Sequence, residues 1–143
     1  RLLPTYIAVA PAASPPESTA AEELRSLLSQ ACPALSFAVG PPLVGETTQI
    51  AVGSGAAVKI GLPRAMLPVG DERLLLHTML RPKSSAVAVG GSGRGTLYAV
   101  YQLLERVGFR FFAPDETRVP ECPSQLPTFK ALYMEPDFGA HRA

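Results

Sequence analysis

The chain has 143 residues, of which 47% are hydrophobic and 17% charged, and its formal net charge is +1. This length suits one domain with a sizeable core, and the apolar fraction excludes a disordered chain. The near-neutral charge gives no electrostatic case for nucleic acid or for an anionic membrane, and no apolar run is long enough to span a bilayer.

The first two thirds of the chain contain five strand-like runs and one helical segment. The strand-like runs are, in chain order, residues 5–10, 35–39, 48–52, 73–79 and 85–89. Between the first two, apolar residues at helical spacing predict a helix with Ser18 as its N-cap and Pro33 as its stop. Residues 53–70 predict a long loop with room for a helical turn. The link at residues 81–84 is short enough for a hairpin.

A glycine-rich turn, a second helix and an aromatic strand follow. Glycines between residues 90 and 95 permit a tight strand-to-helix turn. Apolar residues then share one helical face, and Gly108 stands where a C-terminal glycine stop belongs. Residues 109–112 predict a short strand that completes the core. Residues 115–143, with scattered prolines, predict a segment that wraps the surface.

Strands interspersed with two helices, plus one hairpin, predict an α/β (α+β) fold with a single mixed β-sheet and two helices packed on one face. We expect residues 1–120 to form this domain and residues 121–143 to form an extended linker. The two cysteines, Cys32 and Cys122, have no metal-ligand spacing around them. A disulfide and two separate thiols are equally compatible with the sequence.

Residues 87–115 (VAVGGSGRGTLYAVYQLLERVGFRFFAPD) resemble the end of the domain that precedes the catalytic barrel in α-glucuronidase-like and hexosaminidase-like glycoside hydrolases. The group whose barrel is a domain of unknown function is the most similar. Looser likenesses lie elsewhere in the chain; they are AAEEL at residues 20–24, IAVG at 50–53, Val119-Pro120, and EPDF at 135–138 with Arg142. The family often has Trp where Phe111 stands, and residues 53–70 match poorly.

The resemblance implies a non-catalytic accessory domain that packs against and supports a catalytic barrel of the same parent protein. Residues 121–143 would then be the run-in to that barrel, which lies outside this chain. The parent is expected to be a glycoside hydrolase acting on O-glycosyl bonds, secreted or enclosed in a vesicular lumen, with a glycan as a further partner. Two alternatives stay open: a carbohydrate- or protein-binding module acting on its own, and a small standalone enzyme.

The glycine-rich turn, residues 90–96 (GGSGRGT), lies between a strand and a helix, where phosphate-binding loops lie. A P-loop needs Lys before its final Ser or Thr, and this turn has none. The dinucleotide pattern, counted from Gly91 and Gly93, needs glycine at the position of Thr96. We therefore expect a turn used for close helix–sheet packing, with Arg94 as an ordinary surface arginine.

Other side chains that could suggest chemistry are better explained by structure. Adjacent carboxylates point apart on a strand or turn, and those early in the first helix complement its dipole. The histidines stand alone, and aromatic residues at helical or strand spacing are more often core than a sugar-stacking platform. These residues are Glu22, Glu23, Asp71, Glu72, Asp115, Glu116, His77, His141, Tyr98, Tyr101, Phe109, Phe111 and Phe112. We assign no catalytic residue, no cofactor site and no metal site to this chain.

Overall fold

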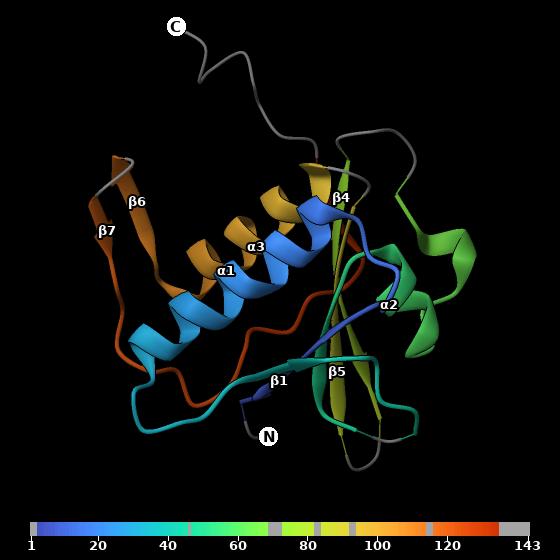
Figure 1. Ribbon diagram of the computed structural model, residues 1–143, viewed down its shortest axis with the longest axis horizontal. Helices are drawn as coiled ribbons and strands as arrows, with labels where there is room; N and C mark the ends of the chain where they lie inside the picture. Colours follow the sequence, from blue (N-terminus) through green and yellow to red (C-terminus); the bar gives the residue numbers. More distant parts are fainter. Residues whose placement is uncertain are drawn as a thin grey trace, which may run out of the picture.

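A six-stranded mixed sheet organises the fold, in the order β2-β1-β3-β5-β4-β8 (Figure 1). The computed structural model describes residues 3–45, 47–68, 73–81, 84–91, 94–113 and 116–134. Its strands are β1 Tyr6–Val9, β2 Ala38–Gly40, β3 Gln49–Val52, β4 Leu74–Leu80, β5 Ser85–Gly91 and β8 Leu132–Met134. Strands β2, β1, β3 and β5 are parallel neighbours, and β4 is antiparallel to both β5 and β8. The predicted α/β fold with a mixed sheet is confirmed.

Two long helices, α1 (Pro15–Ala31) and α3 (Arg94–Val107), pack side by side on one face of the sheet (Figure 1). Their inner faces bury Leu24, Leu28 and Leu104 completely. Removing a leucine side chain from water is worth about 1.5–3 kcal/mol, so these positions hold the layer together. The predicted placement of two helices on one face is confirmed.

The opposite face carries a six-residue helix, α2 (Ser54–Lys59), and a 3-10 turn, η1 (Arg64–Met66) (Figure 1). Successive strand residues point to opposite faces, so Ile50 faces the long helices while Ala51 packs against Ala56 of α2. The small side chains on this face let the short helix approach the sheet closely. Both elements lie in the stretch predicted as a long loop with room for a helical turn.

The first helix begins earlier than predicted, because Ser14 rather than Ser18 is its N-cap. Prolines at the first helical positions are tolerated, since their missing N–H groups would have no intrahelical partner. The Glu17 carboxylate accepts hydrogen bonds from the N–H and the hydroxyl of Ser14, each 3.0 Å long. Because the Ser14 side chain also accepts from the backbone N–H of Glu17, this arrangement is a capping box. The end of the helix before Pro33 agrees with the prediction.

The strand boundaries also shift. The second strand is Ala38–Gly40 rather than residues 35–39, because Leu35 still belongs to a turn in which its N–H donates to the Cys32 carbonyl. The predicted hairpin is confirmed: β4 and β5 pair antiparallel from Leu74 opposite Gly91 to Leu80 opposite Ser85. The connecting residues 82–83 lie outside the described residues.

The aromatic strand does not complete the core in the way predicted. It is β6 (Arg110–Ala113), and it pairs with β7 (Glu116–Arg118) in a separate two-stranded sheet. Phe109 is fully buried, whereas Phe112 is 64% exposed. The strand therefore leaves the main sheet, and only the residues next to α3 reach the core.

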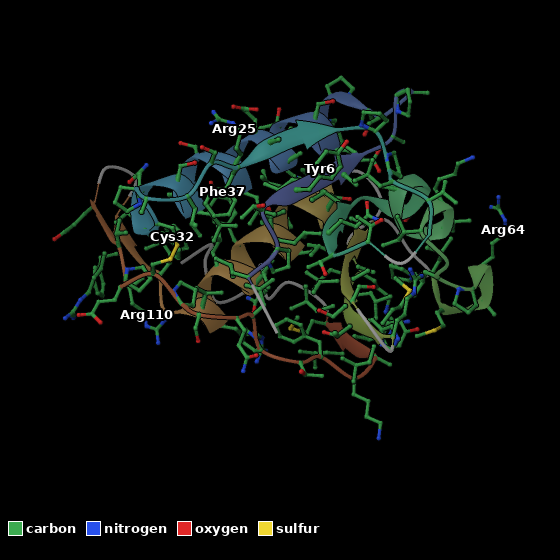
Figure 2. All side chains as sticks on the ribbon, turned by 90° about the horizontal axis from the view of Figure 1, so that it is seen from below. Tyr6, Arg25, Cys32, Phe37, Arg64 and Arg110 are labelled. Atoms are coloured by element: carbon green, nitrogen blue, oxygen red, sulfur yellow. A yellow bond between two sulfur atoms is a disulfide. The ribbon has the colours of Figure 1, made fainter. Side chains whose placement is uncertain are left out.

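Residues 121–134, the described part of the predicted linker, run along the surface of the domain and are attached to it at several points. Cys122 forms a disulfide with Cys32 across 90 residues of sequence, and Figure 2 shows Cys32 at the end of α1. Further along, Phe129 is buried, and two hydrogen bonds join it to Thr78. The Thr78 N–H donates to the Phe129 carbonyl at 2.8 Å, and the Phe129 N–H donates to the Thr78 hydroxyl at 2.9 Å. Strand β8 then joins the edge of β4. Residues 135–143 lie outside the described residues.

Reducing the Cys32–Cys122 disulfide should lower the free energy of unfolding by about 3–5 kcal/mol, because the bridge closes a long loop in the unfolded chain. Urea unfolding with and without a dithiol reductant measures the difference. A Cys32→Ala/Cys122→Ala variant is the control and should not respond to the reductant. A change below about 1 kcal/mol in the parent chain would contradict this account.

Replacing Ser14 with alanine should cost about 1 kcal/mol of stability, because the cap of α1 is lost. The matched variant Ser18→Ala removes a hydroxyl one turn later on the exposed face and should change stability by less than about 0.5 kcal/mol. Denaturant midpoints of the two variants make the comparison. The reverse order would restore Ser18 as the cap.

Candidate functional site

The carboxyl ends of the parallel strands are the first place to look for a ligand site. Open α/β sheets bind ligands there, at the topological switch point. At this point the connections from two neighbouring strands lead to opposite sides of the sheet. Strand β1 has β2 on one side and β3 on the other, so that point lies at the carboxyl ends of β1 and β3, with the end of β5 next to it. Ala10, Gly53 and Gly91 lie at these three strand ends. Which groups fill this edge decides whether a ligand can bind.

Glu17 fills the part of this edge that lies next to Gly53. Gly53 has φ +96°, and a Cβ atom placed on it would overlap the Glu17 carboxylate. Gly53 is also the N-cap of α2, so the carboxylate lies at the positive end of that helix. The other oxygen of Glu17 is engaged by Ser14. A carboxylate of the chain itself therefore takes the position that an anionic ligand would need.

The end of β5 is closed by α3. A Cβ atom on Gly91 would lie 2.6 Å from the carbonyl carbon of Gly95 and 2.8 Å from the Thr96 nitrogen. The Gly91 carbonyl accepts hydrogen bonds from the Thr96 hydroxyl at 2.8 Å and from the Ser54 hydroxyl at 3.2 Å. These contacts support the interpretation of the glycine-rich turn as a packing turn. Ser92 and Gly93 lie outside the described residues, and Arg94 is exposed at the start of α3.

The candidate carboxylates and histidines are not brought together in the described residues. Glu22 forms an ion pair with Arg25, whose hydrogen bond lowers the pKa of that carboxyl, so it is held ionised. Glu116 lies exposed on β7. His77 accepts a 2.9 Å hydrogen bond from the Ala131 N–H through Nδ1. Asp71, Glu72, Asp115 and His141 fall outside the described residues.

Among the residues that the structure describes, no group of three or more His, Cys, Asp or Glu could hold a metal ion. The described helices include none that is both long and apolar enough to cross a membrane.

The five candidate aromatic residues do not form one platform. Tyr101 meets Phe111 edge to face at 5.0 Å, and Phe109 stacks with Phe111 at 6.2 Å between ring centroids. The Tyr101 hydroxyl donates to Glu23 at 3.1 Å; burial, followed by the charge of this carboxylate, raises the pKa of Tyr101. Tyr98 is half-buried against the core. Phe112 is the one member of this group whose side chain is mostly exposed.

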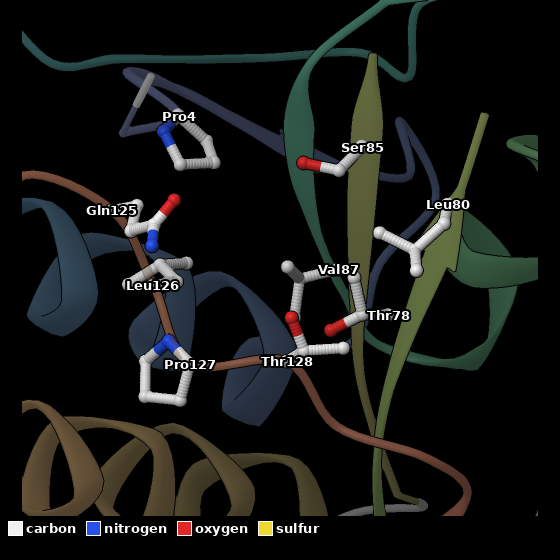
Figure 3. Close-up of a pocket in the computed structure, with 9 residues that line it drawn as sticks. All are labelled: Pro4, Thr78, Leu80, Ser85, Val87, Gln125, Leu126, Pro127 and Thr128. Atoms are coloured by element: carbon white, nitrogen blue, oxygen red, sulfur yellow. The ribbon is translucent and has the colours of Figure 1, made fainter. Parts of the chain in front are cut away.

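Beside the described residues 125–132 of the C-terminal segment, the structure has two hollows. One has a volume of about 30 Å³ and is bounded by the β4–β5 hairpin, with Thr78 and Ser85, and by Gln125 and Thr128 opposite it (Figure 3). This volume suits water and is too small for a sugar ring, since small-molecule pockets run from about 300 to 1,000 Å³.

The second hollow is an open depression of about 430 Å³. Its lining consists of Arg106, Pro127, Thr128, Phe129, Lys130 and Leu132. Sequence reasoning missed it, because its two cations lie far apart in the chain and only the docking of the C-terminal segment beside α3 brings them together.

No protein-family model matches the sequence, and no curated protein matches it either. The residues themselves therefore carry the functional argument.

Replacing Gly91 with alanine should lower stability by about 2–3 kcal/mol, because the new methyl group would press on backbone atoms of α3 that cannot move cheaply. Gly90→Ala is the matched control: nothing lies within 4 Å of its added Cβ, so its cost should be below about 1 kcal/mol. Urea unfolding of both variants checks this. Equal costs would contradict the close contact between Gly91 and the first turn of α3.

Proposed function

We propose that this chain forms a non-catalytic accessory domain of a glycoside-hydrolase-like protein and packs against a catalytic barrel of that protein. The proposal begins with the resemblance of residues 87–115 to the domain preceding such barrels. The observation that carries it is the contact of Gly91 with Gly95 and Thr96. This contact makes the most distinctive part of the resembling segment a packing joint between helix and sheet.

The carboxylates of α1 support the same role. Glu17 is engaged by Ser14, Glu22 by Arg25, and Glu23 by Tyr101. A glycosidase needs one carboxylic acid and one carboxylate on either side of the scissile bond. These carboxylates already cap a helix, pair with an arginine of the same helix or join α1 to α3, so they do not supply the catalytic acid and its partner carboxylate. We therefore place the hydrolytic chemistry on the barrel.

The β6–β7 ribbon offers a surface for a neighbouring domain. A two-stranded hairpin is marginally stable by itself, and this one is anchored through Phe111, which packs on Tyr101. Beside that anchor, Phe112 is 64% exposed. A packed neighbour would cover this ring and stabilise the ribbon.

The alternative is a carbohydrate- or protein-binding module that acts on its own. Phe112 is the observation that favours it, because an exposed ring can stack on a sugar. Tyr101, Phe109 and Phe111 pack against the core, so Phe112 is the one mostly exposed ring among the five candidate aromatic residues, and these five form no platform. This difference favours the accessory role.

We infer an extracellular or vesicular location for the protein. Disulfides form and persist in oxidising compartments, so the Cys32–Cys122 bridge supports this inference.

The open reading frame that encodes residues 1–143 tests the accessory role. It should continue into alternating strand and helix patterns of a (β/α)₈ barrel, and the isolated chain should hydrolyse none of a panel of chromogenic glycosides. A stop codon after Ala143 together with glycan binding by the isolated chain would favour the alternative instead. Glycoside turnover by the isolated chain would overturn both.

A further inference from the structure

Among the residues that the structure describes, the lining of the depression beside the end of α3 has two cations and no carboxylate. Arg106 comes from the last turn of α3, and Lys130 comes from the segment that leads into β8. The rest of the lining is apolar except for the Thr128 hydroxyl. Glu105 precedes Arg106 on the helix but does not line the depression.

Neither cation has an oxygen partner in the part of the chain that the structure describes. Arg106 makes one contact, from Nη2 to the Met134 sulfur at 3.5 Å, and a guanidinium has five N–H donors. Lys130 makes no hydrogen bond or ion pair within the described residues. By contrast, Arg81 donates to the carbonyls of Gly45 at 2.8 Å and Ile60 at 2.5 Å.

The charge of Arg106 is not needed to compensate the helix dipole. The negative end of α3 is already met by Arg110, which donates to the carbonyls of Glu105 at 2.8 Å and Phe109 at 2.7 Å. The N–H groups of Gly108 and Phe109 also bond to the last carbonyls of the helix. The guanidinium of Arg106 is therefore left for a group that the described chain does not provide.

The wall that carries Lys130 is held in place before anything binds. Phe129, on one side, is tied to Thr78 by two hydrogen bonds and is only 5% exposed. Ala131, on the other side, donates its N–H to His77. A backbone fixed at both neighbours lowers the entropy cost of presenting the ammonium group to a partner.

We propose that this depression docks one or two carboxylate side chains from the surface of a neighbouring folded domain. Two unpaired cations in a concave site call for an anion, and carboxylates form charge-assisted hydrogen bonds with both. A protein side chain is favoured over an acidic sugar, because the buried Phe129 offers no ring face for stacking. That the neighbour is the catalytic barrel rests on the proposed function.

Titration of the isotope-labelled 143-residue chain with a hexaglutamate peptide at low salt tests the proposal. Saturable amide shifts should appear at Arg106 and residues 128–132 and should weaken as salt rises. Arg106→Gln and Lys130→Gln should each weaken binding about 3- to 10-fold, as expected when one charge-assisted hydrogen bond is lost. The control Lys59→Gln/Arg64→Gln removes two exposed charges from the opposite face of the sheet and should leave the affinity within about 2-fold.

Four results would overturn the proposal. Equal weakening by the control variant, or no localised shifts, would show non-specific attraction or none. Tighter binding of a hexasaccharide of glucuronic acid would identify a sugar site. Stronger peptide binding, by about tenfold or more, in a Glu135→Gln/Asp137→Asn variant would show that acidic residues of this chain occupy the depression. The peptide titration does not involve the barrel, so its failure would leave the reading-frame test of the proposed function intact.

Discussion

The close contact between the end of β5 and the first turn of α3 is the constraint on which the rest of the structure depends. Backbone atoms of Gly95 and Thr96 occupy the space where a side chain on Gly91 would lie. The Thr96 hydroxyl stabilises this contact by donating a hydrogen bond to the Gly91 carbonyl. This contact fixes the height of α3 above the sheet. Helix α1 then packs beside α3, and the buried leucines of both helices meet the sheet face in one core. The disulfide ties the end of α1 to the segment that completes the sheet.

The same constraint bears on function. The carboxyl edge of a parallel sheet is where α/β proteins bind ligands, yet here the chain fills it with its own groups. Glu17 lies against Gly53, and the Ser54 and Thr96 hydroxyls bond to the Gly91 carbonyl. Residues that could have supplied chemistry are used for capping and packing. Among the described residues, the exposed Phe112 ring and the basic depression are open to a partner, and we propose that both contact a neighbouring domain.

Local signals in the sequence were sufficient for the elements that local physics determines. Helical spacing and the Gly108 stop predict α3, whose following glycine has φ +128° in the structure. The start of α1 was predicted too late, because Pro15 and Pro16 were interpreted as loop residues although Ser14, which precedes them, is the N-cap. Strand β8 has three residues in a proline-rich segment and becomes a strand only by pairing with β4. The disulfide and the basic depression depend on the tertiary fold, which brings distant residues together, and no local pattern could have predicted them.

The central claim is that the glycine-rich turn is a packing joint and not a ligand site. The most direct measurement is an NMR titration of the chain with inorganic phosphate, magnesium-ATP and NAD, following the amide signals of Gly91, Gly95 and Thr96. The account predicts that none of these signals shifts saturably, because Gly91 already meets Gly95 and Thr96 where a phosphate would have to approach. Saturable shifts at these three residues with any of the compounds would contradict it.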